Sequence, residues 1–226
     1  MKNRIVLILL LLPFAVSCTQ PAAQTEEKEY MEDAFFSYVE GLHIAYNLAK
    51  YGYKTESPSA LIEAADMIAN FSPWEFDAAV EQGPDNANET EKIEKVQFHP
   101  EQLIADALAM TDDPHLLAIA DKVLANSEIL PCGARSVATA YGRVSARSYM
   151  CYDLNFYASQ IAEVSVVGDG DTDLDLYIYD ENDHLIASAT DYTDDCFVRF
   201  NPRWTGLYRI KIVNRGGVYN NYVIAY

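Results

Sequence analysis

The sequence predicts an α+β protein in which a helical module precedes an antiparallel β-sandwich. Between residues 30 and 130 the apolar residues recur at helical spacing, whereas from residue 150 onward they alternate with polar residues in short runs. At 226 residues, half of them hydrophobic, the chain is long enough to bury a core.

Residues 1–17 have the pattern of a signal peptide. A basic start is followed by a short apolar run and then by small residues that lead to Cys18. The apolar run is too short to span a membrane.

The ending Ala15-Val16-Ser17-Cys18 resembles the bacterial lipobox. The resemblance implies that Cys18 is acylated and becomes the mature N-terminus of a lipoprotein, held to a membrane of the cell envelope by its lipid. Thr19 follows where an aspartate would direct retention in the inner membrane, so we expect the outer membrane. The side of that membrane stays open, and an ordinary signal peptide with a chance cysteine is the alternative.

The mature chain is strongly acidic. Loss of Lys2 and Arg4 leaves 14 basic residues against 34 acidic ones, a net charge of about −20. Such a surface repels nucleic acid, so we expect no nucleic-acid partner. Residues 18–29 are polar and acidic, which predicts a tether between the lipid and the folded part.

Residues 30–130 are predicted to form helical hairpins. One apolar stripe runs from Tyr30 to a stop at Gly52, and Ser57-Pro58 begins the next helix. The segment Thr55–Pro58 returns 56 residues later as Thr111–Pro114, which indicates an αα repeat. These helices either hold the sandwich at a distance from the membrane or contact a protein partner, or they pack on the sheet domain.

Residues 131–226 are predicted to form the sandwich, with the boundary at Pro131. Seven or eight short runs alternate, which is typical of antiparallel strands with one buried face. The inward residues are Tyr152, Leu154 and Phe156; Val164 and Val166; Leu174, Leu176 and Ile178; Cys196, Val198 and Phe200; Tyr208, Ile210 and Ile212; and Tyr222 and Ile224. The same alternation turns Cys196 inward and Cys151 outward, which argues against a disulfide between them and leaves the connectivity with Cys132 open.

The residues that suggest a site are aspartates. Asp169, Asp171, Asp173 and Asp175 precede or enter one strand, and calcium prefers several carboxylate and carbonyl oxygens, so we expect a tentative calcium site there. A second acidic loop with Asp191, Asp194 and Asp195 would converge on it if the intervening strands form a hairpin. The alternative is that these aspartates pair with Arg199, Arg209 or Lys211.

Catalytic signatures are scarce. The sequence has no serine-nucleophile elbow, no zinc-protease motif, no phosphate-binding loop and no cysteine pair at zinc spacing. The chain is therefore expected to be non-catalytic, although a glycosidase-type carboxylate pair among its acids is left open.

The last 90 residues or so resemble the bacterial pre-peptidase C-terminal domain, through Asp173–Tyr177, Trp204–Tyr208 and Asn214–Tyr222. The resemblance implies an accessory, jelly-roll-like sandwich that in some relatives binds calcium or matrix polymers. No peptidase precedes it here.

We therefore expect an envelope lipoprotein that binds an unidentified polymer, such as a polysaccharide, or a protein partner. The alternative is a hydrolase with a carboxylate site between the helices and the sandwich.

Overall fold

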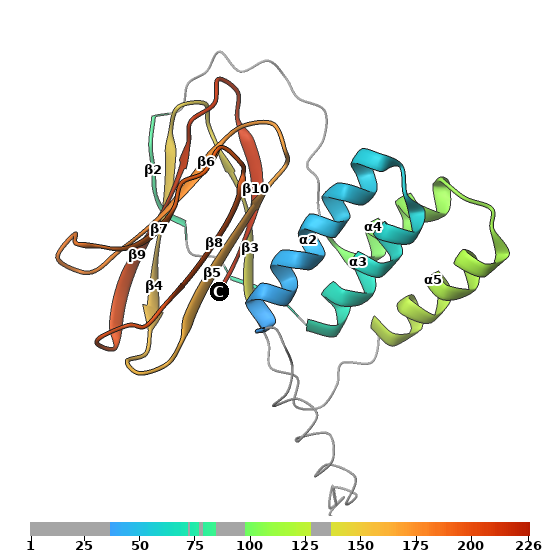
Figure 1. The fold of residues 1–226 in the computed structure, drawn as a ribbon, viewed down its shortest axis with the longest axis horizontal. Helices are drawn as coiled ribbons and strands as arrows, with labels where there is room; N and C mark the ends of the chain where they lie inside the picture. Colours follow the sequence, from blue (N-terminus) through green and yellow to red (C-terminus); the bar gives the residue numbers. More distant parts are fainter. Residues whose placement is uncertain (1–36, 72, 77–78, 85–97, 128–136) are drawn as a thin grey trace, which may run out of the picture. The chain divides into compact units, whose positions relative to one another are not determined.

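The structure is a computed structural model that describes residues 37–71, 73–76, 79–84, 98–127 and 137–226. It contains four helices and two sheets rich in antiparallel pairs, so the chain is an α+β protein with a β-sandwich, as predicted (Figure 1). The predicted signal peptide, Cys18, the predicted tether and Cys132 lie outside the described residues. In the described part of the chain, no helix is long and apolar enough to cross a membrane.

The helices are α2 (Tyr38–Thr55), α3 (Pro58–Phe71), α4 (Pro100–Ala109) and α5 (Pro114–Ser127). Helix α3 packs against each of the other three. The predicted proline starts are present: α3 begins at Pro58 after the hydroxyl of Ser57, which accepts from the amide of Ala60 at 3.4 Å. Helix α5 begins at Pro114 after Asp113, whose carboxylate accepts from the amide of His115 at 2.9 Å.

The strands lie in two five-stranded sheets. The first sheet has the order β1-β3-β10-β5-β8 and the second the order β2-β4-β9-β6-β7. The β1–β3 pair is parallel and the other seven pairs in these sheets are antiparallel. The bounds are β1 Trp74–Glu75, β2 Ala79–Gln82, β3 Ala138–Val144, β4 Tyr149–Phe156, β5 Ala162–Gly168, β6 Leu174–Tyr179, β7 Leu185–Ala189, β8 Asp195–Phe200, β9 Gly206–Asn214 and β10 Asn220–Ala225.

The predicted inward residues form the core between the two sheets. Leu174, Leu176 and Ile178 of β6 are fully buried there, as are Ile210 and Ile212 of β9. Alternation along each strand therefore identifies the face that meets the opposite sheet.

The first sheet is also buried on its outer face, because α2 packs across β5, β8 and β10. Val167, Val223 and Ala225 point away from the sandwich core and join the helical core, where each is at most 1% exposed. Strand β5 is accordingly buried along its whole length. The helices thus pack on the sheet domain, which was one of the two roles that the sequence left open.

Three polar contacts align α2 with β5. At the start of the helix the Ser37 hydroxyl donates to Glu163. One turn and a half further on, His43 Nδ1 lies 2.9 Å from the hydroxyl of the buried Ser165. Burial lowers the pKa of His43, so the ring that fills this position is neutral near pH 7.

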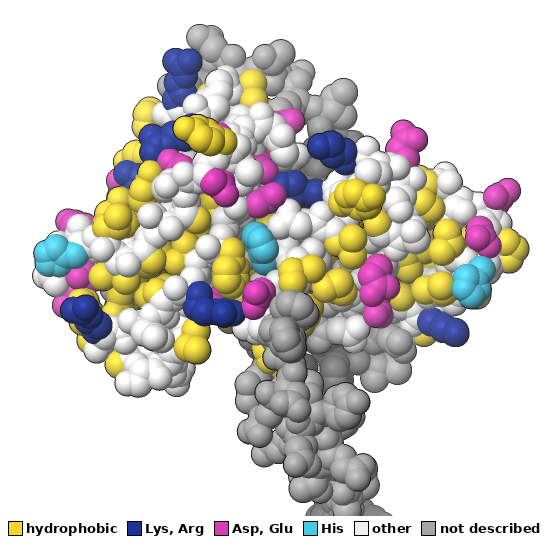
Figure 2. Space-filling view, viewed as in Figure 1, with side chains coloured by type: hydrophobic (Ala, Val, Ile, Leu, Met, Phe, Trp, Pro, Cys, Tyr) yellow, Lys and Arg dark blue, Asp and Glu magenta, His cyan; other side chains and the backbone are white. Residues whose placement is uncertain are grey.

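The third contact is a buried ion pair near the other end of α2. Lys50 Nζ lies 2.8 Å from Asp194 Oδ1 and 2.7 Å from Asp195 Oδ1, and the Asp194 side chain is only 6% exposed. Burial alone would lower the pKa of Lys50, but the hydrogen bonds to the two carboxylates raise it above its usual value. Figure 2 shows acidic, basic and histidine side chains along the line where the helices meet the sandwich.

Two sequence expectations are wrong in detail. Gly52 does not stop the first helix, which continues to Thr55 and ends where Glu56 adopts a left-handed conformation (φ 52°). The glycine is needed for packing instead, because a Cβ there would lie 2.6 Å from Leu61 Cδ2 of the next helix.

The second difference concerns residues 74–82, which the sequence placed in the helical module. Strand β1 adds to the edge of the first sheet and β2 to the edge of the second, with Phe76 between them packed against Tyr152 and Tyr226. Strands of two and four residues are too short to show a period of two, so the pattern was missed.

The Lys50 ion pair gives a stability prediction. Lys50→Met should lower the free energy of unfolding by about 2 to 3 kcal/mol, because it leaves Asp194 buried without its cation. Urea unfolding followed by circular dichroism would measure the change. The matched control is Lys54→Met on the exposed side of the same helix, which should change stability by less than about 0.5 kcal/mol. Equal losses in the two variants would contradict a structural role for the pair.

Candidate binding face

The predicted acidic loops do lie side by side. Strands β6 and β7 form the expected hairpin, and the amide of Leu174 donates to the carbonyl of Thr193 at 2.9 Å. The amide of Gly168 donates to the carbonyl of Asp194, also at 2.9 Å. A Cβ on Gly168 would lie 2.4 Å from Asp194 Oδ2, so only glycine allows the two loops to approach this closely.

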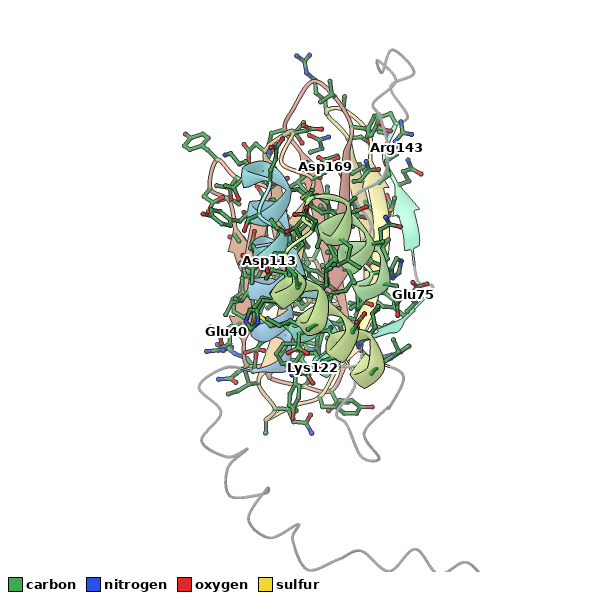
Figure 3. The ribbon with its side chains drawn as sticks, turned by 90° about the vertical axis from the view of Figure 1, so that its right-hand side faces the viewer. Glu40, Glu75, Asp113, Lys122, Arg143 and Asp169 are labelled. Atoms are coloured by element: carbon green, nitrogen blue, oxygen red, sulfur yellow. The ribbon has the colours of Figure 1, made fainter. Side chains whose placement is uncertain are left out.

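The aspartates of these loops have separate partners. Asp194 Oδ2 accepts from the amide of Gly170, whose φ of +92° suits glycine, and from the amide group of the fully buried Asn220 at 3.2 Å. Asp169 Oδ2 accepts from the backbone amide of Asn221 at 3.0 Å and from its side chain at 3.2 Å. Figure 3 labels Asp169 near one end of the molecule and Glu40, near the start of α2, toward the other.

Asp175 pairs with a cation that the sequence analysis did not consider. Its carboxylate accepts from Arg215 Nε and, at 2.9 Å, from the Tyr177 hydroxyl, and the residue is 5% exposed. The arginines that we considered pair elsewhere: Arg199 contacts Glu163 and Glu40, and Arg209 contacts Asp153 and Glu81. Arg215 follows β9 and reaches the start of β6 because these strands are neighbours.

Asp173 is the exception, because its Oδ1 is buried without a hydrogen-bond partner in the described structure. Burial and the neighbouring Asp175 raise the pKa of the Asp173 carboxyl. Within the described ranges, no three His, Cys, Asp or Glu side chains are arranged to hold a metal ion. The arrangement therefore does not gather Asp169, Asp171, Asp173 and Asp175 around one cation, and calcium binding stays a prediction from the sequence.

The outer face of the second sheet differs from that of the first. On β4, β9 and β6 it presents tyrosines between charged residues, in rows set by the strand register. Cys151 lies opposite Lys211, which lies opposite Tyr177. The next row holds the pairs Asp153–Arg209 and Arg209–Tyr179. Because β6 and β4 flank β9, these rows form one continuous surface.

Fixed contacts hold the side chains of this face. The Tyr177 and Tyr179 rings stack with centroids 6.2 Å apart and planes 25° apart, and Lys211 Nζ lies 4.3 Å from the centre of the Tyr149 ring. Arg209 donates to both oxygens of Asp153, at 2.9 and 3.0 Å. Bidentate pairs and cation–π contacts of this kind limit the rotamers of long side chains.

A shallow hollow of about 180 Å³ lies in the centre of this face. It is lined by Glu81, Tyr149, Cys151, Tyr179, Asp183, Arg209 and Lys211. Pockets that enclose a drug-sized ligand have volumes of roughly 300 to 1,000 Å³, so this hollow has room for only part of a larger ligand. We call the exposed outer side of β4, β9 and β6, with this hollow, the open face.

The two described cysteines are free thiols, Cys151 under the open face and Cys196 in the sandwich core. Cys196 Sγ donates to the carbonyl of Leu174 at 3.1 Å. Burial raises the pKa of both thiols, which disfavours their thiolate forms at neutral pH.

The fold and this surface define an α+β protein with a β-sandwich, one sheet of which packs against helices while the other carries an open face. No protein-family model matches the chain, and no curated protein matches it. Solved structures give weak likenesses to part of the chain.

The pre-peptidase C-terminal domain of collagenase from Bacillus anthracis is 14% identical, with a TM-score of 0.28 over 41% of this chain and 77% of that one. PliG from Aeromonas hydrophila, a periplasmic inhibitor of g-type lysozyme, is 13% identical, with a TM-score of 0.33 over 43% and 90%. The C-terminal CBM6 of LamC from Zobellia galactanivorans is 15% identical, with a TM-score of 0.25 over 36% and 73%. Such low scores carry no argument about function.

The Asp173 carboxylate, whose Oδ1 has no hydrogen-bond partner in the described structure, either binds a metal ion or only destabilises the fold, and a mutation distinguishes these two roles. In the presence of a chelator at pH 7, Asp173→Asn should stabilise the fold by up to about 1 kcal/mol. The raised pKa means that the fold favours the protonated carboxyl, so ionisation costs stability above that pKa. Thermal unfolding would measure the change, with Asp112→Asn in an exposed turn as the control.

Millimolar calcium extends the same experiment. If the predicted calcium site forms, calcium should raise the melting temperature of the wild type by several degrees and that of Asp173→Asn by less. An unchanged melting temperature of the wild type in calcium would contradict the calcium prediction. The effect of Asp173→Asn in chelator would then report only the cost of the buried carboxylate.

Proposed function

We propose that this protein is a non-catalytic, lipid-anchored envelope protein that binds a polysaccharide across the open face of its second sheet. The observation that carries the proposal is the contrast between the two sheets. Helix α2 packs over β5 of the first sheet, whereas the second presents tyrosine rings and paired charges around a hollow.

The chemistry of the open face supports a polymer of sugar units. The Tyr177 and Tyr179 rings offer flat apolar surface, and Arg209 and Lys211 offer donors beside it. A hollow of about 180 Å³ would hold one unit while neighbouring units lie along the shallow surface. Side chains already fixed by stacking and ion pairs lose little conformational entropy when a ligand binds.

The proposal includes the helical repeat and the jelly-roll type of the sandwich. The matching proline starts of α3 and α5 support a repeated helical hairpin that precedes a jelly-roll-like sandwich. In this proposal the helices hold the first sheet and leave the second for the ligand.

The hydrolase alternative has less support. Four carboxylates at the junction of helices and sandwich, those of Glu40, Glu163, Asp194 and Asp195, each contact Arg199 or Lys50. Turnover of glycoside, ester or peptide substrates by the purified protein, lost in Asp194→Asn, would nevertheless overturn the non-catalytic proposal.

The open face is tested by binding to polysaccharide extracted from the envelope of the source cells. Tyr179→Ala should weaken co-sedimentation about tenfold, because an aromatic anchor at the centre of a binding surface carries a large share of the affinity. Tyr192→Ala is the matched control: Tyr192 is 96% exposed in the β7–β8 loop and lies outside the open face. Equal affinity of the two variants would contradict the proposed surface, and capture of a protein in place of polysaccharide would contradict the proposed ligand.

Lipid anchoring is tested at Cys18. Growth with radiolabelled fatty acid should label the wild-type protein and place it in the outer-membrane fraction, whereas Cys18→Ala should carry no label, because the acyl chains need the thiol. A labelled Cys18→Ala protein, or an unlabelled wild type, would contradict the anchor.

A further inference from the structure

The two ends of the sandwich differ in charge. The acidic loops with Asp169 and Asp194 lie where β5 ends, whereas the loops at the start of β5 and of β9 are nearly free of charge. Residues 154–162 and 200–208 contain no acidic residue and one basic residue, Arg203, in a chain with 34 acidic residues. A surface without acids is therefore an exception in this protein.

Large apolar side chains are exposed at this end. Tyr157 is 60% exposed and Ile161 68%, both in the β4–β5 loop, and Leu207, the second residue of β9, is 50% exposed. The loops lie side by side, because the amide of Ala158 donates to the Thr205 hydroxyl at 2.9 Å and the amide of Ser159 to the carbonyl of Pro202 at 3.4 Å. Single exposed apolar residues are ordinary, but three at one end of the sandwich form a candidate contact surface. We call these three residues and their loops the apolar tip.

The acidic β6–β7 turn is set back from the apolar tip. Strand β6 ends at Tyr179, opposite Arg209, whereas β9 and β4 extend to the Gly206–Phe156 pair. The apolar tip therefore lies beyond the last pair of β6 along the sandwich.

The described chain also begins at this end. Ser37 donates to Glu163, the residue two positions after Ile161, and α2 runs from there toward Lys50 at the opposite end. Figure 1 shows the start of α2 at the same end as the loops that join β4 to β5 and β8 to β9. Ser37, the first described residue, therefore lies at the end of the sandwich that carries the apolar tip.

We infer that the apolar tip contacts the surface of the membrane that holds the lipid anchor, an inference that rests on the anchoring at Cys18 proposed above. Tyrosine is enriched where membranes meet water, and short apolar side chains beside it enter the boundary between headgroups and acyl chains. One arginine in two segments that contain no acidic residue suits phosphate headgroups, whereas the acidic end of the sandwich is repelled by them. Contact through the tip directs the acidic loops away from the bilayer.

The test uses the full acylated chain in phosphatidylcholine vesicles, with bromine on the lipid chains close to the headgroups as a short-range quencher of tryptophan fluorescence. Trp74→Phe and Trp204→Phe first remove both native tryptophans. The second change costs no hydrogen bond, because Trp204 Nε1 is buried without a partner in the described structure. Tyr157→Trp then places a probe on the apolar tip, and Tyr192→Trp places the matched probe at the opposite end.

We expect brominated lipid to lower the fluorescence of the Tyr157→Trp protein about twofold and to leave that of the Tyr192→Trp protein unchanged. Adding Ile161→Asp should abolish the quenching at position 157, because a charge in the tip opposes its insertion, while the protein still floats with the vesicles. Flotation without quenching at position 157, or equal quenching at both positions, would overturn the inference and leave the anchor intact. Failure to float would instead overturn the proposed anchoring.

Discussion

The packing of α2 across β5 is the interaction on which the rest of the structure depends. It buries the outer face of the first sheet, where Glu163, Ser165 and the neighbouring Asp194 would be costly to bury without partners. Helix α2 supplies one partner for each, from Ser37, His43 and Lys50. Because all three must be satisfied together, they fix the helix in one register along the strand. The second sheet makes no such packing with α2, and this asymmetry gives the molecule its open face.

The sequence predicted the sandwich well because one period dominates its strands. Leu174, Leu176 and Ile178 alternate without exception, and the structure buries all three. The double burial of β5 was missed because its polar residues alternate too, so Glu163 and Ser165 looked like a solvent face. The unbroken apolar run from Val166 to Val167 and the run from Tyr222 to Ala225 are the signals typical of a strand covered on both sides.

The acidic loops show why local patterns do not determine a site. Alternation correctly placed Asp173 and Asp175 at the entrance of β6, but their electrostatic surroundings come from residues far along the chain. Arg215 lies forty residues after Asp175, and Asn220 lies 26 residues after Asp194. Likewise Arg209, Lys211 and Tyr177 alternate with the inward residues of their strands, yet only the strand order β4-β9-β6 makes them neighbours. That order depends on pairing between distant segments, which no short window of sequence records.

The segment that contains β1 and β2 precedes part of the helical module in the chain but pairs with the strands of the sandwich. It is made between α3 and α4, yet it completes one edge of each sheet, against β3 and β4. The sandwich strands that follow residue 137 therefore need a piece of chain that emerged before them, while the first sheet needs α2 from earlier still. Contacts across such long stretches slow folding and leave sheet edges open until they close. A chain with this topology reaches its compact state only after β10 has been made, so the helices and the sandwich become protected together.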